Sequence, residues 1–286
     1  MIVCLNGTFI SHEDARLPIN DGGFLFGDTL FETLKAHEEK ILLLPQHLDR
    51  LEQSAKLLNF PCDRQKIESS LRQMSAALKS PTSRIRLTLS RGGFQGLSWP
   101  TTEQSWFLIT AVEYQEPTDA ERQAGAACII TPNQRINPVS HLPQMKRGNY
   151  ADCLYAANYA RQSGAREALF IDHNQNILEA STSNLFAIID DKLITPPTGT
   201  LVLDGIIRRQ VIAAAAELGI SVVERELSLT ELLQAQEAFL TNSLIDILPI
   251  LSIDGQTVSR GDYWKSILKT LWIRIDLDLT NWHGTI

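Results

Sequence analysis

The chain has 286 residues, of which 44% are hydrophobic and 21% charged, so it is long enough for one large or two modest domains with real cores. Its formal net charge of −7 argues against a general nucleic-acid-binding protein. The cysteines are far apart and form no CxxC pair, which predicts reduced thiols in a cytoplasmic protein, without a metal site or disulfide framework. There is no signal-peptide pattern and no hydrophobic run near the roughly 20 residues that span a bilayer, so we expect no membrane segment.

The first hundred or so residues predict a mixed α/β unit. Ile2–Leu5 and Thr8–Ile10 flank Asn6-Gly7, a dipeptide preferred in two-residue hairpin turns because both central positions need positive φ. The glycine-rich run DGGFLFGD at 21–28 lacks the GKS/T ending of a P-loop and the GxGxxG spacing of a dinucleotide site, so we interpret it as a tight loop. Further strands are expected at 29–36, 41–44, 83–90 and 106–112, and helices at 46–58 and 63–78.

A polar segment at 113–122 contains Pro117 and has no hydrophobic period, which predicts the crossing between two domains. We therefore expect a small N-terminal α/β domain at 1–116, a linker at 117–122 and a larger C-terminal domain at 123–286. In the C-terminal part, strands are expected at 126–131, 168–171, 176–179, 185–189, 192–195, 222–226, 238–241 and 247–252, and helices at 151–161, 207–218, 229–234 and 263–274.

A lysine and a carboxylate lie at opposite ends of a predicted helix and hairpin: Lys146 precedes the helix and Glu179 ends the second strand. This order suits a pyridoxal phosphate enzyme, in which a lysine forms the Schiff base and a carboxylate keeps the pyridine nitrogen protonated. Such enzymes also need an arginine and backbone N–H groups at a helix start for the phosphate, and Gly205 precedes a predicted helix. Taken alone, each charged residue is explained equally well as a solvated surface charge, and Gly205 as an ordinary helix end. Their order and spacing favour the cofactor site.

Motifs along nearly the whole chain resemble those of the fold-type IV pyridoxal phosphate enzymes, the class IV aminotransferase family. The motifs are FGDTLFETL at 26–34, HLDRL at 47–51, KRGNY at 146–150, GAREALFID at 164–172, ILEASTSNLF at 177–186, LITP at 193–196, LDGI at 203–206 and FLTNSLIDILPI at 239–250. The resemblance implies a D-amino-acid aminotransferase-like α+β or α/β fold, with the cofactor in the cleft between two domains. It also implies a homodimer with shared active sites and a small amino-acid-type substrate.

The same resemblance assigns roles to individual residues. Lys146 would be the catalytic Schiff-base lysine and Glu179 would face the pyridine nitrogen. The cofactor phosphate would be bound by Arg50, by the backbone N–H groups of Ile206 and Ile207, and by the polar groups of Thr241 and Asn242. Tyr150 would lie near the cofactor hydroxyl. Ser181 and Thr182 would lie close to the ring. Phe31 and Glu32 would line the substrate side, with Arg91 and Arg135 as candidate substrate-carboxylate binders.

Two reactions remain open. The run Thr241-Asn242-Ser243-Leu244 resembles an ending common in 4-amino-4-deoxychorismate lyases, whereas KRGNY is closer to the branched-chain aminotransferase pattern. We expect the lyase, which releases pyruvate and 4-aminobenzoate from aminodeoxychorismate in folate biosynthesis. The alternative is a D-amino-acid or branched-chain amino-acid aminotransferase, and a non-catalytic dimer that retains the fold is the remote alternative.

Overall fold

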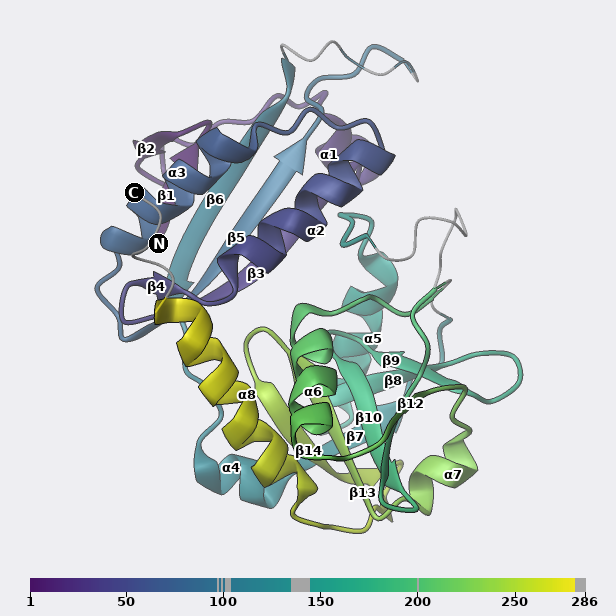
Figure 1. Cartoon of the computed structure of the whole chain (residues 1–286). Coiled ribbons are helices and arrows are strands. Elements are labelled where there is room, and N and C mark those ends of the chain that lie inside the picture. Colours follow the sequence, from purple (N-terminus) through teal and green to yellow (C-terminus); the bar gives the residue numbers. More distant parts are fainter. Residues whose placement is uncertain (97, 99, 101–103, 135–144, 200, 281–286) are drawn as a thin grey trace. The chain divides into compact units, whose positions relative to one another are not determined.

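The computed structural model describes residues 1–286 except 97, 99, 101–103, 135–144, 200 and 281–286 (Figure 1). The described residues divide into two compact units. Unit 1 contains Met1–Glu116 and Met145–Tyr150, and unit 2 contains the described parts of Pro117–Gln144 and Ala151–Thr280. This division differs from the boundaries expected from sequence, because residues 145–150 belong to the first unit.

Unit 1 is built on a six-stranded sheet with the order β2-β1-β6-β5-β3-β4. The neighbouring strands of this sheet pair antiparallel. The strands are β1 (Ile2–Leu5), β2 (Thr8–Ile10), β3 (Thr29–His37), β4 (Lys40–Ile41), β5 (Thr82–Ser90) and β6 (Trp106–Glu113). The first hairpin was predicted correctly, and Asn6 and Gly7 both have positive φ in its turn.

Helices α2 (Leu44–Leu57) and α3 (Arg64–Ala76) cover one face of this sheet (Figure 1). Alternation along β3 sends Leu30, Glu32 and Leu34 to the helix-covered face and Phe31 and Thr33 to the other. The strand expected at 41–44 is shorter than predicted. Leu43 adopts a left-handed conformation (φ 52°), and α2 begins at the next residue with Pro45 in its first turn.

The glycine-rich run that we interpreted as a loop contains a short helix, α1 (Gly22–Phe26). The Asp21 carboxylate caps its start by accepting N–H bonds from Gly23 at 2.8 Å and Phe24 at 3.3 Å. Gly27 ends it in the left-handed conformation that glycine adopts at low strain (φ 67°). A five-residue helix is too short to produce a hydrophobic period, so only its caps are visible in the sequence.

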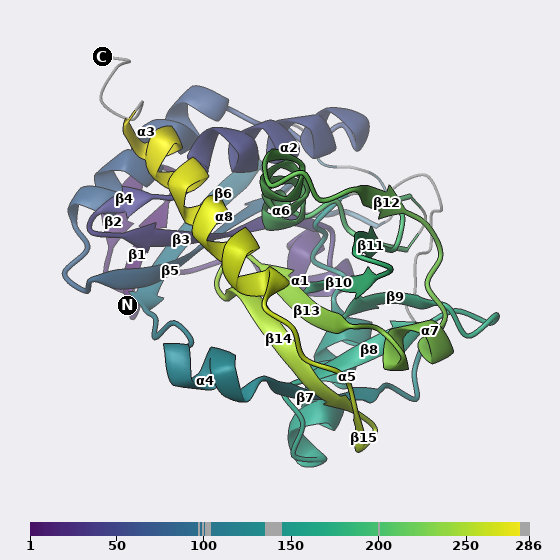
Figure 2. The ribbon, with the colours of Figure 1, turned by 60° about the horizontal axis from the view of Figure 1, so that its bottom comes forward.

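Unit 2 is built on a nine-stranded sheet whose main order is β12-β11-β10-β13-β14-β7-β8-β9, with β15 paired to β14 (Figure 2). The strands are β7 (Ala126–Ile130), β8 (Glu167–Ile171), β9 (Ile177–Ala180), β10 (Asn184–Ile189), β11 (Lys192–Thr195), β12 (Val222–Glu224), β13 (Glu237–Asn242), β14 (Asp246–Ile253) and β15 (Gln256–Thr257). The pairs β7–β8, β7–β14 and β11–β12 are parallel, so this sheet is mixed. Its core includes the fully buried Leu169, Ala187 and Leu240.

The helices of unit 2 are α4 (Asp119–Ala124), α5 (Ala151–Gln162), α6 (Ile206–Glu217), α7 (Leu229–Leu233) and α8 (Tyr263–Thr280). Helix α5 packs on β8, whereas α6 and α8 pack on each other and against β13 and β14 (Figures 1 and 2). Helix α4 occupies part of the segment expected to be a linker. It carries a capping box between Thr118 and Glu121, and Arg122 donates to the main-chain oxygens of Ile245 and Ile247.

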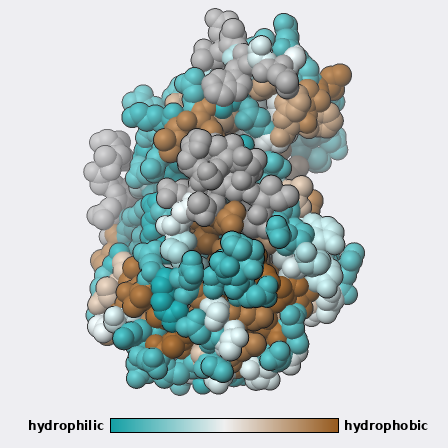
Figure 3. All heavy atoms as spheres, turned by 90° about the vertical axis from the view of Figure 1, so that its right-hand side faces the viewer, coloured by the Kyte–Doolittle hydropathy of each residue, from teal (hydrophilic) through white to brown (hydrophobic). Residues whose placement is uncertain are grey.

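Hydrophobic side chains also reach the surface, among hydrophilic ones, in the view of Figure 3. The most exposed large hydrophobic residues include Ile19 and Phe24 in unit 1 and Leu154 and Leu277 in unit 2. Single exposed hydrophobic residues are ordinary at protein surfaces, whereas Phe24 is followed by the exposed Leu25 and Phe26. Throughout the described ranges, no helix combines the length and the apolar character needed to span a bilayer.

Candidate active site

Lys146 is positioned by backbone pairing at the edge of β3. The Phe31 N–H donates to the Lys146 carbonyl at 2.9 Å, and the Gly148 N–H donates to the Thr29 carbonyl at 2.8 Å. Gly148 allows this approach, since a Cβ at this position would lie 1.9 Å from the Thr29 hydroxyl oxygen. The position of the lysine backbone is therefore set by the sheet of unit 1, although the two segments are more than 110 residues apart in the sequence.

The aromatic side chains of Phe31 and Tyr150 surround the lysine amine. Lys146 Nζ lies 4.8 Å from the centroid of the Phe31 ring and 5.8 Å from that of Tyr150. The two rings meet edge to face, with centroids 5.5 Å apart. The structure thus places three of the predicted site residues in one cluster of unit 1.

A second cation, Arg86 of β5, belongs to the same cluster. Its guanidinium carbon lies 3.9 Å from the Phe31 ring centroid, and its Nε donates to the Thr88 hydroxyl at 3.2 Å. Partial burial lowers the pKa of Arg86, and its side chain forms no ion pair with any described residue. Arg86 was not predicted, because a charge in an alternating strand has the appearance of an ordinary solvent-facing residue.

Arg50 lies on the other face of the same sheet, in a buried group with Glu32 and His47. Arg50 Nε and Nη2 donate to the two carboxylate oxygens of Glu32 at 2.8 and 2.6 Å, and His47 Nδ1 lies 2.7 Å from Glu32 Oε2. Burial raises the pKa of Glu32, but the Arg50 charge and the hydrogen bonds outweigh it and hold the pKa at about 2. Burial lowers the pKa of His47, so the imidazole is neutral near pH 7 and donates its Nδ1 proton.

This geometry separates Phe31 from Glu32, which were both expected to line the substrate side. Consecutive strand residues point to opposite faces, and the Phe31 ring is the one whose centroid lies 4.8 Å from Lys146 Nζ. Glu32 instead orients Arg50. The phosphate-binding role of Arg50 stays a prediction, and a bidentate partner would hold its guanidinium in one orientation.

Arg91 has a structural role that speaks against the predicted contact with substrate. Its Nε donates to Asp28 at 2.8 Å, and its two terminal nitrogens donate to the Asn59 and Leu58 carbonyls at 2.6 and 2.5 Å. The guanidinium also stacks on the Phe60 ring at 3.7 Å. Arg91 therefore binds the C-terminal end of α2. Arg135, the other candidate, lies outside the described residues.

In unit 2, Glu179 is buried and joined to the segment before α6. Its Oε2 accepts from the Leu203 N–H at 2.9 Å and from Asn184 Nδ2 at 3.4 Å. The same Asn184 amide donates to the Leu203 carbonyl at 2.8 Å. Sequence reasoning missed Asn184, although it lies within the ILEASTSNLF motif.

The start of α6 has the features of an anion site. Gly205 is its N-cap residue and no side chain caps the helix, so the first N–H groups, including those of Ile206 and Ile207, have no partner within the helix. A Cβ at Gly205 would lie 2.0 Å from Asn184 Oδ1, and Asn184 pairs in register with Thr241. The Thr241 hydroxyl is buried and has no hydrogen-bond partner among the described residues. An uncapped helix start and an orphaned hydroxyl on either side of Asn184 fit a bound phosphate.

The side chain of Asn242 is already committed within the protein. Its Nδ2 donates to the Thr182 carbonyl at 3.3 Å and to the Ser183 hydroxyl at 3.0 Å, and its Oδ1 accepts from the Leu244 and Ile245 N–H groups. Asn242 therefore fixes two turns to each other.

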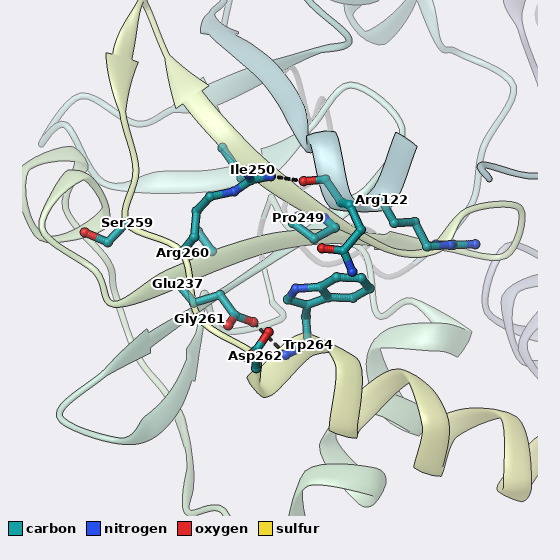
Figure 4. Close-up of a pocket in the computed structure, with 11 residues that line it drawn as sticks. Arg122, Glu237, Pro249, Ile250, Ser259, Arg260, Gly261, Asp262 and Trp264 are labelled. Atoms are coloured by element: carbon teal, nitrogen blue, oxygen red, sulfur yellow. Dashed lines mark hydrogen bonds between the residues drawn. The ribbon is translucent and has the colours of Figure 1, made fainter. Parts of the chain in front are cut away.

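A separate surface pocket of about 220 Å³ lies in unit 2 and contains none of the predicted site residues (Figure 4). It is lined by residues near the start of α8 and the end of α4, including Gln123, Glu237, Arg260 and Trp264. Arg260 donates to the Gln123 carbonyl across this pocket. Across the residues that the structure describes, no group of three or more His, Cys, Asp or Glu side chains is placed to hold a metal ion.

Comparison with known proteins shows the family to which this chain belongs. The family described as Amino-transferase class IV matches residues 29–253. A protein of Methanocaldococcus jannaschii, provisionally named a branched-chain-amino-acid aminotransferase, is 32% identical over 285 residues, covering 95% of this chain and 98% of the relative. A D-alanine aminotransferase of Listeria monocytogenes is 30% identical, covering 91% and 90%. The crystal structure of 4-amino-4-deoxychorismate lyase from Pseudomonas aeruginosa is similar with a TM-score of 0.84 and 25% identity, covering 96% of this chain and 99% of that one.

These features define a pyridoxal phosphate enzyme. The chain belongs to the class IV aminotransferase family, and its cofactor is pyridoxal phosphate. The fold class and the cofactor expected from the sequence are thereby confirmed.

Proposed function

We propose that the chain is an amino-acid aminotransferase that binds pyridoxal phosphate through Lys146 and transfers the amino group of an amino acid to a 2-oxo acid. The names of the two relatives support this choice over the lyase that we expected from sequence. When bound, the cofactor supplies an electron sink for the carbon from which the substrate proton is removed. The lysine amine would take up and return that proton, since the Schiff-base lysine is released when the substrate binds.

The protein groups divide the remaining tasks. Glu179, held by Asn184 and the Leu203 N–H, would face the pyridine nitrogen. The phosphate would be bound by the start of α6 with Thr241 and by Arg50. Tyr150 would lie at the cofactor hydroxyl, and Ser181 and Thr182 close to the ring.

The observation that carries the proposal is the position of Arg86. Arg86 and Lys146 both contact the Phe31 ring, so an exposed cation that has no acidic partner among the described residues shares this ring with the lysine amine. An amino acid bound near Lys146 carries a carboxylate that Arg86 can bind with charge-assisted hydrogen bonds. We propose that Arg86, rather than Arg91, binds the substrate carboxylate.

Arg86→Gln is expected to raise the KM for the amino donor about 10- to 100-fold, because a hydrogen bond to a charged group contributes roughly 1.5–3 kcal/mol. Arg84→Gln is the matched control, since Arg84 lies two residues earlier on the same exposed face of β5. An unchanged KM in Arg86→Gln, or an equal rise in Arg84→Gln, contradicts the assignment.

The lyase is the second candidate, favoured by the Asn242-Ser243-Leu244 run and by the similarity to the Pseudomonas lyase. The two reactions differ in their need for an amino acceptor. Purified protein is incubated with leucine or D-alanine plus 2-oxoglutarate, and separately with aminodeoxychorismate alone. Glutamate formation supports the aminotransferase, and release of pyruvate and 4-aminobenzoate without an acceptor supports the lyase and a place in folate biosynthesis.

We also propose that the protein is a cytoplasmic homodimer with shared active sites, as its family resemblance implies. The four cysteines are unpaired, which suits a reducing compartment. Light scattering coupled to gel filtration tests this directly. A particle with the 31.9 kDa mass of one chain contradicts the dimer.

A further inference from the structure

Glu167, the first residue of β8, carries a buried carboxylate to which the proposed chemistry assigns no role. It lies beneath the turn between β9 and β10. The Thr182 N–H donates to its Oε2 at 3.3 Å, and the Ser183 hydroxyl donates to its Oε1 at 3.0 Å. The hydroxyls of Ser181 and Thr182 also donate to it. One carboxylate therefore accepts four hydrogen bonds from three consecutive residues.

These bonds determine which way the hydroxyl protons of the turn point. An ionised carboxylate accepts hydrogen bonds and cannot donate them. The O–H groups of Ser181, Thr182 and Ser183 are therefore turned towards Glu167. The backbone supports the same arrangement, since the Ser181 N–H donates to the Ala168 carbonyl at 2.8 Å. The hydroxyl oxygens consequently offer lone pairs, and not protons, to anything bound on the outer side of the turn.

The turn is also joined to the residues that follow β13. Asn242 contacts both Thr182 and Ser183 through its amide nitrogen, and the preceding residue is Thr241, whose buried hydroxyl has no described partner. A displacement of the turn would therefore also move Thr241, which is proposed to bind the phosphate. The Glu167 carboxylate accepts the hydrogen bonds that fix this turn.

We propose that Glu167 is a positioning residue for the cofactor: it fixes the Ser181–Ser183 turn and the direction of its hydroxyl protons. The inference rests on the proposed function, in which Ser181 and Thr182 lie close to the cofactor ring. A glutamine at this position keeps the shape but offers one acceptor oxygen in place of two, and its NH₂ group donates. At least one hydroxyl of the turn would then have to rotate its proton away, towards the bound cofactor.

Glu237 provides a matched control in the same unit. It too is the first residue of a strand, is buried and accepts more than one hydrogen bond. Its partners are the N–H groups of Tyr263 at 3.1 Å and Trp264 at 2.6 Å, at the start of α8. Figure 4 shows Glu237 beside Trp264. No residue proposed to bind the cofactor contacts its carboxylate. Glu237→Gln therefore reports the general effect of neutralising a buried acceptor in this unit.

The test measures pyridoxal phosphate binding to the reconstituted full chain, together with the pH dependence of the visible absorbance of the lysine-bound cofactor. Glu167→Gln is expected to weaken binding about 10- to 100-fold, which corresponds to the loss of one or two hydrogen bonds, and to shift the pH midpoint of the absorbance change. Glu237→Gln is expected to bind the cofactor within about twofold of wild type, although both variants unfold at lower temperature.

Two results overturn the inference: wild-type affinity and spectrum in Glu167→Gln, or an equal loss of affinity in Glu237→Gln. If Glu167→Gln does not fold, Ser183→Ala removes a single bond to the carboxylate and is expected to weaken binding a few-fold; unchanged binding then overturns the inference as well. Failure of the proposed function has a different signature, because wild-type protein itself would show no Lys146-dependent cofactor binding.

Discussion

The buried group of Glu32, His47 and Arg50 predicts how stability depends on pH. The unfolded chain protonates Glu32 near its ordinary pKa of 4.5, whereas the folded protein resists protonation down to about 2. The carboxylate therefore contributes to stability above about pH 4.5, and this contribution is lost as the pH falls towards 2. A depression of this size corresponds to about 3 kcal/mol in full, of which about 2 kcal/mol is lost by pH 3.

Glu32→Gln is expected to remove this acid dependence and to lower stability at pH 7 by about 3–5 kcal/mol, because Arg50 then loses the buried carboxylate that pairs with it. The assay is urea unfolding followed by circular dichroism between pH 3 and pH 7, at a fixed saturating concentration of pyridoxal phosphate. Glu68→Gln is the control, because Glu68 pairs with Arg72 at the surface, where an ion pair contributes less than about 1 kcal/mol. A Glu32→Gln variant with the acid dependence of wild type would refute the reasoning.

Three further predictions follow from the site. Lys146→Ala should abolish covalent trapping of the cofactor by borohydride, detected by mass spectrometry, whereas Lys40→Ala should trap it normally; trapping in both would exclude Lys146 as the Schiff-base residue. Gly205→Ala should weaken cofactor binding and lower the unfolding temperature, since its Cβ would overlap Asn184, and adding Asn184→Ala should recover part of the lost stability. Arg91→Met should reduce stability by about 2–4 kcal/mol without changing the KM for substrate, and a large rise in KM would restore its predicted contact with substrate.

The local pattern of hydrophobic and polar residues was sufficient to predict most strands and helices, but it did not predict where they end. The alternation of residues along β5 and the hydrophobic period of α2 are strong signals, and both elements were expected within a few residues of their observed bounds. The run of leucines at 42–44 suits a strand or a helix equally. Its division between the two depends on the left-handed conformation of Leu43, which no hydrophobic pattern indicates.

The candidate site was accessible from sequence only through motifs, and motifs do not reveal which charges neutralise each other. Arg50 and Arg91 are both arginines in family-like segments, yet one meets Glu32 across a sheet-helix interface and the other binds a helix end. Arg86 lacks a described acidic partner for the same non-local reason. Such pairings depend on segments distant in the sequence, so residue type and spacing alone cannot supply them.

The pairing of residues 146–148 with β3 also has a consequence for folding and for engineering. A chain that ends at the apparent domain boundary near residue 116 would leave the N–H and C=O groups at the edge of β3 without their partner segment. Unpaired strand edges promote association between chains. We therefore expect a 1–116 fragment to aggregate unless the 145–150 segment is supplied, for example through a short linker after residue 116. During synthesis the edge of β3 stays open until residues 145–150 have been added and have left the ribosome.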